Sequence, residues 1–163
     1  MKQCRILAIL ACALVAHSAF ACVASGPEKT AQWIHTNERS FAFQSEGSDL
    51  TKRKRFLSPR LYDLLAANWK CENAEQGLCG LDSDPWVNAQ DGGELLPIKF
   101  SLLITTAAAA TVRMSYTFGW TGTPGEAAET QLKFIKNAKS GCWLLDDLVG
   151  RAKYSLIEQL QVQ

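Results

Sequence analysis

The sequence lacks an excess of charge of either sign. It has 17 Lys and Arg residues and 16 Asp and Glu residues among 163, which gives a formal net charge of +1 at pH 7. The first 25 residues contain Lys2, Arg5 and no acidic residue, so the rest of the chain carries 15 basic and 16 acidic side chains. A domain that binds DNA or RNA needs a strongly basic surface. The composition therefore argues against a nucleic-acid partner.

Long hydrophobic runs are missing after the N-terminal segment. A helix that spans a membrane needs about 20 predominantly apolar residues, and no later stretch approaches that length, so we expect no transmembrane helix. The chain is 47% hydrophobic and 20% charged and has no internal repeat. Since domains hold about 100–200 residues, this composition predicts one globular domain.

Histidine is scarce, and the short motifs of several enzyme classes are absent. The two histidines are His17 and His35, and there is no GxSxG pattern of a serine nucleophile and no HExxH pattern of a zinc protease. Zinc sites also need clustered Cys and His ligands, which the cysteine spacing does not supply. We therefore expect no metal and no cofactor.

The N-terminus has the pattern of a signal peptide. Lys2 and Arg5 precede an apolar run over residues 6–16, and Ala19-Phe20-Ala21 supplies the small–x–small cleavage site. We expect cleavage after this site and a periplasmic protein. The chain then divides into a signal peptide, a short linker and one domain: residues 1–21, 22–29 and 30–162.

Cleavage after Ala21 makes Cys22 the first residue of the mature chain, as in bacterial lipoproteins. The preceding residues resemble a lipoprotein cleavage motif only in part, because Ala19 replaces the usual leucine and the bulky Phe20 occupies a position where a small residue is expected. We therefore expect a lipid anchor through Cys22 to be less favoured than an unanchored chain.

Four cysteines remain after the signal peptide, and an even number in an oxidising compartment favours disulfides. Cys71 and Cys79 flank a short polar loop that contains Gly77, which predicts a bond between them. Cys142 is then either a buried free thiol or the partner of Cys22. Lipidation of Cys22 would exclude this second bond.

Helical signals dominate the first half of the chain. Residues 28–43 carry a loose helical stripe, and Ser58-Pro59 begins the clearest helix as N-cap and first helical residue. We expect this helix to end near Cys71. Between these segments the basic run over residues 52–55 is expected to be the solvated face of a helix. The buried face of the clearest helix is predicted by its apolar spacing: Leu61, Leu64, Leu65 and Trp69.

The second half changes to the period-two alternation of strands. Alternating apolar residues predict strands over residues 98–105 and 112–120, and shorter patterns predict strands at 132–134 and 142–145. Before them, Asp84 and Pro85 predict a capped helical turn, and Asp91-Gly92-Gly93 predicts a tight turn. A short helix over residues 154–160 closes the chain. The order predicts an α+β fold: N-terminal helices packed on one face of a curved four-stranded antiparallel sheet.

Short motifs in this chain resemble a bacterial family of mostly exported proteins that is known as domain of unknown function 3828. The resemblance covers residues 30–162 and implies a cone-like fold similar to nuclear transport factor 2 and the cystatins. Some small exported domains of that shape are immunity proteins, so the resemblance also implies a binding role. It is carried by four segments: Asp82-Ser83-Asp84-Pro85-Trp86, Ala89-Gln90-Asp91, Trp143-Leu144-Leu145-Asp146-Asp147 and Ser155-Leu156.

Two groups of carboxylates are candidate sites. Asp82, Asp84 and Asp91 have the oxygen ligands that Ca²⁺ prefers but not the spacing of a calcium loop, so a cap-and-turn role is favoured. Asp146 or Asp147 has the chemistry of a general base, although only one of them can face the core if alternation holds. A carboxylate that accepts backbone N–H groups or pairs with Arg113 is the favoured interpretation. The five tryptophans lie in apolar patterns and are expected in the core.

These patterns leave two hypotheses for function. The first is a non-enzymatic periplasmic binding module, such as an inhibitor or immunity protein against a cell-wall-degrading toxin. The second is a small pocket enzyme that uses Asp146 or Asp147 as general base. A deep pocket around a carboxylate with a raised pKa would favour the enzyme, and a filled core with a protruding loop would favour the binder. The candidate binding residues are Asp82, Asp84, Trp86, Gln90, Asp91, Arg113, Asp146 and Asp147.

Overall fold

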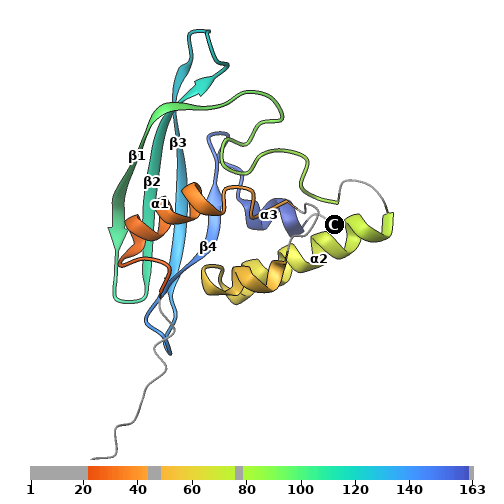
Figure 1. The fold of residues 1–163 in the computed structure, drawn as a ribbon, viewed down its shortest axis with the longest axis vertical. Coiled ribbons are helices and arrows are strands. Elements are labelled where there is room, and N and C mark those ends of the chain that lie inside the picture. Colours follow the sequence, from red (N-terminus) through yellow and green to blue (C-terminus); the bar gives the residue numbers. More distant parts are fainter. Residues whose placement is uncertain (1–21, 44–48, 76–78, 162–163) are drawn as a thin grey trace, which may run out of the picture.

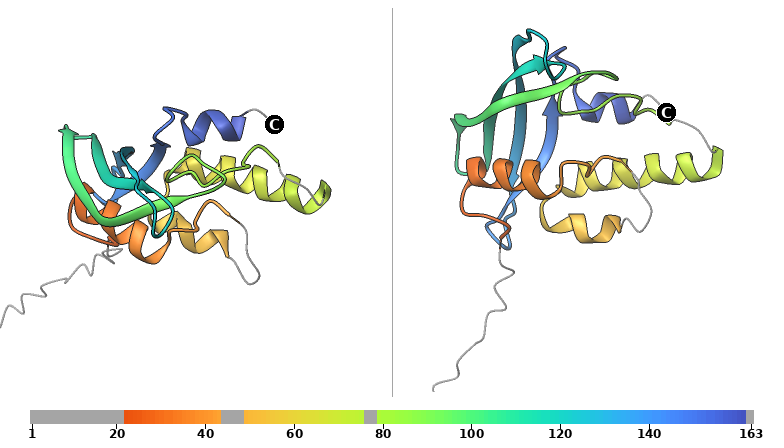
Figure 2. Two further views of the ribbon diagram at one scale, coloured as in Figure 1. Left: turned by 90° about the horizontal axis from the view of Figure 1, so that it is seen from above. Right: turned by 45° about the horizontal axis from the view of Figure 1, so that its top comes forward.

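The computed structural model describes residues 22–43, 49–75 and 79–161, and the predicted signal peptide lies outside them. The described chain has the α+β fold that the sequence predicted. Helices pack against one face of a curved, four-stranded antiparallel sheet (Figures 1 and 2). Within the described ranges, no helix is long and apolar enough to cross a membrane.

The sheet is a simple meander, because its strands pair in the order in which they occur in the chain. The inward row of β2 is fully buried, as its alternation predicted, and includes Val112, Met114 and Tyr116. Most strands extend beyond their apolar patterns, since polar residues continue the backbone ladder once pairing has begun. The strands are β1 (Gly93–Thr105), β2 (Ala109–Gly119), β3 (Glu126–Lys136) and β4 (Trp143–Val149).

The meander gathers three connecting segments at one end of the sheet. Since neighbouring strands are antiparallel, the start of β1, the β2–β3 connection and the end of β4 share this end. We call it the loop end; it consists of residues 82–92, 120–125 and 150–154. The β2–β3 connection protrudes from it (Figure 1, top). The turns between β1 and β2 and between β3 and β4 lie at the opposite end.

The helices follow their predicted signals with shifted ends. Helix α1 (Pro27–Asn37) begins inside the segment expected to be a linker. Helix α2 (Pro59–Glu75) begins after Ser58, whose hydroxyl accepts the Leu61 N–H at 3.1 Å. It continues beyond Cys71, where we expected it to end, because no glycine or proline occurs before Gly77.

Helix α3 (Leu156–Gln161) is shorter than predicted and begins with a reciprocal cap. The Glu158 N–H donates to the Ser155 hydroxyl at 3.3 Å, and the Ser155 N–H donates to the Glu158 carboxylate at 3.4 Å. This pairing satisfies backbone donors that the first turn of a helix leaves free.

The basic run over residues 52–55 lies in a 3₁₀ helix, η1 (Leu50–Arg55). The prediction that all four basic side chains are exposed to solvent is wrong for one of them. Arg53 is buried, donates to the Phe41 carbonyl and lies 4.7 Å from the centre of the Trp69 ring. Burial lowers the pKa of Arg53. The other basic side chains of the run are exposed.

Two disulfides close the fold. The predicted Cys71–Cys79 bond is present and ties the end of α2 to the following segment. Cys22 pairs with Cys142, which resolves the alternatives left open for Cys142 and ties the N-terminal segment to the start of β4. The second bond joins residues 120 positions apart, whereas the first joins residues 8 apart.

This difference in loop length predicts unequal effects of removing the two disulfides. In the chain-entropy model, Cys22→Ser with Cys142→Ser should cost about 5 kcal/mol of stability, and Cys71→Ser with Cys79→Ser about 2–3 kcal/mol. Urea unfolding of the two double variants measures both free energies. Equal losses, or a larger loss for the short loop, would contradict the expectation.

Candidate functional site

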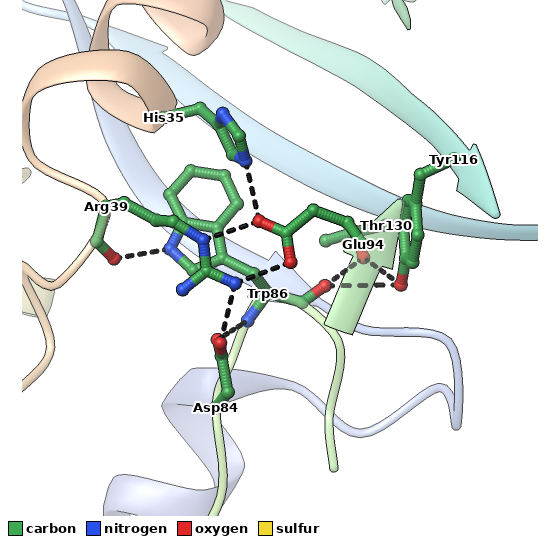
Figure 3. A network of polar contacts seen from close by, with 7 residues as sticks. All are labelled: His35, Arg39, Asp84, Trp86, Glu94, Tyr116 and Thr130. Carbon is green, nitrogen blue, oxygen red and sulfur yellow. Dashed lines mark hydrogen bonds and ion pairs between the residues drawn. The ribbon is translucent and has the colours of Figure 1, made fainter. Parts of the chain in front are cut away.

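The segment over residues 82–91 has the cap-and-turn structure that the sequence predicted. The Asp84 carboxylate accepts the Trp86 N–H at 2.9 Å, and the Asp84 carbonyl accepts the Asn88 N–H at 2.7 Å. Because this turn fixes the backbone, the Trp86 side chain points into the core, where it is 0% exposed. Its indole N–H donates to the Arg39 carbonyl at 2.7 Å (Figure 3).

The backbone of Trp86 is also bound to the sheet. Its carbonyl accepts hydrogen bonds from the Thr130 hydroxyl of β3 and, at 3.4 Å, from the Tyr116 hydroxyl of β2 (Figure 3). Burial raises the pKa of Tyr116. Trp86 therefore fills the space between the sheet and the chain that follows α1, with both polar ends of the residue satisfied.

A network of charged side chains surrounds the Trp86 ring (Figure 3). The Glu94 carboxylate at the start of β1 accepts two hydrogen bonds from Arg39, at 2.5 and 2.6 Å, and lies 3.0 Å from the His35 Nε2. Arg39 donates a further bond to Asp84 at 2.6 Å. The network thus joins α1, the segment after it, the 82–91 turn and β1.

This network holds Glu94 in its ionised form. Burial alone would raise the pKa of Glu94, but hydrogen bonds from His35 and Arg39 outweigh it and lower the pKa to about 2. Burial would likewise lower the pKa of Arg39, and its bonds to Glu94 and Asp84 raise that pKa instead. A carboxylate with such a low pKa is a poor proton acceptor at neutral pH.

The structure corrects the expected alternation at Asp146 and Asp147. In the pairing of β3 with β4, Phe134 lies opposite Leu145 and Lys133 opposite Asp147, so Asp146 is an extra, bulged residue. Uninterrupted alternation predicted that Asp147 shares the core face of Leu145. Because of the bulge, it does not.

Asp147 is nevertheless buried, and its oxygens already have partners. They accept the Ser155 hydroxyl at 2.9 and 3.0 Å and the Ile157 N–H at 3.3 Å, and Lys133 Nζ lies 3.1 Å away. Arg113, which we had considered as its partner, lies on the outer face of the sheet beside Glu129 at 3.2 Å. Asp147 thus accepts one backbone N–H together with a hydroxyl and the Lys133 ammonium.

The remaining candidates lie at the loop end. Asp82 and Gln90 line an open hollow of about 410 Å³ together with Tyr154, while Asp91 is exposed beside it. Both Asp84 oxygens are used, one by Trp86 and one by Arg39. In the part of the chain that the structure describes, no three His, Cys, Asp or Glu side chains are grouped to hold a metal ion.

Trp120 is the residue that sequence reasoning placed wrongly. We expected it in the core with the other tryptophans, but it is 58% exposed at the base of the protruding β2–β3 connection. The Trp120 ring lies edge-on to the Phe118 ring, with 6.2 Å between the ring centres. The Arg151 guanidinium lies over the Phe118 ring, 4.1 Å from its centre. The signal that it is a loop residue was the glycine-rich stretch over residues 119–125, which includes Trp120.

Aromatic side chains from two connections are therefore exposed at the loop end. Tyr154 is 62% exposed, and Arg151 pairs with Glu126 across the hollow of about 590 Å³ beside the β2–β3 connection. Asp82, Gln90 and Tyr154 line the first hollow, and Arg151 lines the second. Together with the exposed Trp120, we call these residues the loop-end surface.

No protein-family model, curated protein sequence or solved structure matches this chain. The resemblance given by the short motifs therefore stays a prediction, and the loop-end surface has to be interpreted from its own geometry.

The difference in burial between Trp86 and Trp120 predicts that the same substitution lowers stability strongly at one position and weakly at the other. Trp86→Ala should lower the free energy of unfolding by about 3–5 kcal/mol, since it removes a fully buried ring. Trp120→Ala should change it by less than about 1 kcal/mol because that ring is mostly in water. Urea unfolding of both variants measures the difference, and a large loss in Trp120→Ala would mean that its ring is a core residue.

The Glu94 network predicts a loss of stability in acid. Because the folded-state pKa of about 2 lies below the ordinary value of 4.5, this stabilisation is complete above about pH 5 and is lost as the pH falls toward 2. The loss is at most about 3 kcal/mol. Unfolding experiments from pH 5 to pH 2 should show a steeper decline in the wild type than in Glu94→Gln. Glu129→Gln, which changes an exposed carboxylate, is the control; an unchanged slope in Glu94→Gln contradicts the prediction.

Proposed function

We propose that this protein is an exported, non-enzymatic binding protein that recognises a partner protein through its loop-end surface. The observation that supports this most is the exposed Trp120, held against Phe118 at the base of a protruding connection. Tryptophan, tyrosine and arginine are the residues that most often dominate binding energy at protein interfaces, and the loop-end surface contains one of each.

The alternative of a pocket enzyme finds less support. Trp86 occupies the space under the sheet in which an enzyme of this shape would hold its substrate. Glu94 has a lowered pKa rather than the raised one that a buried general base needs, and Asp147 is engaged by Ser155 and Ile157. A filled core beneath exposed connections is what we expected of a binder.

The shape of the surface favours a concave partner. A narrow connection that protrudes beyond the sheet fits into a cleft rather than onto a flat surface, as inhibitors of enzymes do. Together with the sequence resemblance, this leads us to propose an exported cell-wall-degrading enzyme as the partner, with this protein as its inhibitor or immunity protein.

A periplasmic location without a lipid anchor fits this role. Disulfides persist in oxidising compartments, and the sulfur of Cys22 that an anchor would need is bonded to Cys142. We therefore propose that the mature chain begins at Cys22 and reaches its partner unanchored.

A capture experiment tests the proposed surface. The mature chain, immobilised and exposed to periplasmic extract, should retain a partner that Trp120→Ala loses by at least about tenfold while its circular dichroism spectrum is unchanged. Ile104→Ala is the matched control, because Ile104 is 63% exposed at the opposite end of the sheet. Equal capture by Trp120→Ala, or equal loss in Ile104→Ala, would place recognition elsewhere.

A further inference from the structure

A cleft lies between η1 and the β3–β4 turn, at the end of the sheet opposite the loop-end surface. It has a volume of about 310 Å³, near the lower limit of pockets that bind small molecules. Its walls come from segments more than 80 positions apart in the chain, so no local sequence pattern indicates it. The lining residues are Lys54, Arg55, Asn137, Lys139, Ser140, Cys142 and Leu144.

The charged residues that the structure places in the cleft lining are positive. Lys54 and Arg55 come from η1 and Lys139 from the β3–β4 turn, and none of the acidic residues that the structure describes lines the cleft. Arg55 has a partner in Glu38 at 3.2 Å. Lys54 and Lys139 have no ion pair within the residues that the structure describes. Like charges facing each other across a cleft repel, and an anion between them would relieve that repulsion.

The cationic groups from η1 are held in place by aromatic rings. Lys54 Nζ lies 4.6 Å from the centre of the Tyr62 ring, and the Arg55 guanidinium lies 4.7 Å from that of Trp33. Such cation–π contacts fix the ends of side chains that would otherwise sample many rotamers. The entropy cost of ordering these two groups around a ligand is therefore partly met before binding.

The uncharged polar lining offers hydrogen-bond donors. Asn137 uses its side-chain oxygen within the turn, where it accepts the Lys139 and Ser140 N–H groups at 2.9 and 3.0 Å. This leaves the amide N–H₂ of Asn137 available to donate. The Ser140 oxygen accepts the Cys142 N–H at 3.3 Å, so its hydroxyl hydrogen is available as well. A lining with free hydrogen-bond donors favours a ligand whose polar atoms accept hydrogen bonds, such as the oxygens of a carboxylate.

The apolar part of the lining consists of Leu144 and of Cys142, whose sulfur is bonded to Cys22. We propose that this cleft binds a small organic anion whose carboxylates face Lys54, Lys139 and Asn137 and whose apolar part rests on Leu144. The volume suits such a molecule, and inorganic phosphate would leave the apolar part of the lining in contact with water.

The probe for this site is phthalate, an aromatic dianion, and its neutral isostere phthalamide is the matched control ligand. Titration calorimetry should give saturable one-to-one binding of phthalate that weakens as salt is raised, and much weaker binding of phthalamide. Lys54→Gln and Lys139→Gln should each weaken phthalate binding by about tenfold, since each removes a charge-assisted hydrogen bond. Lys99→Gln makes the same charge change at an exposed residue of β1 and should leave binding unchanged.

Three results would overturn the proposal. One is no saturable binding of phthalate, including the case in which only phosphate binds; another is equal binding of phthalate and phthalamide; the third is an equal loss in Lys99→Gln. A polyglutamate peptide that binds through Lys54 and Lys139 when phthalate does not would assign the cleft to an acidic segment of a partner protein instead. Circular dichroism spectra of the glutamine variants establish that they are folded. None of these outcomes depends on Trp120, so this test and that of the loop-end surface can fail separately.

Discussion

The burial of Trp86 is the constraint on which most of the fold depends. Its ring has to be covered on every side, and its indole N–H and carbonyl both need partners inside the protein. Arg39, Thr130 and Tyr116 supply them. These contacts connect the segment after α1, β2 and β3 to one residue, so the helical half and the sheet half of the chain share a single core.

The ionic network follows from the same constraint. The Arg39 carbonyl is turned toward the Trp86 indole, and the Arg39 side chain, which reaches Asp84 and Glu94, then needs negative partners because it is half-buried. The carboxylates of Glu94 and Asp84 are those negative partners. The charged oxygens and nitrogens of this cluster therefore bind one another inside the protein.

Local features of this protein could be predicted from the sequence, whereas features that depend on distant partners could not. The alternation through β2, the Ser58 cap and the Asp84 turn involve residues a few positions apart, and each was predicted. The bulge at Asp146 depends on Ser155 and the Ile157 N–H, which pull Asp147 out of alternation. Arg53 is buried because carbonyls and a ring from other segments surround it. The candidate residues of the 82–91 turn were named from the sequence, but Trp120 was not. The apolar alternation of β2 continues to Trp120, one residue beyond the end of the strand, so the pattern placed Trp120 in the core.

The net charge of this chain does not describe its local charges, and the reason lies in how the charges are distributed. Carboxylates such as Glu94, Asp84 and Asp147 are used inside the protein, where they satisfy Arg39, Lys133 and backbone N–H groups. Lys54 and Lys139 stay at the surface, on the two walls of one cleft. A chain with nearly balanced charge can thus present a local positive field wherever its carboxylates are engaged elsewhere. The near-zero total argues against a broad electrostatic surface for nucleic acid, but a small anion responds to the few groups within a Debye length of it. For a ligand of that size, the relevant charge is that of the cleft.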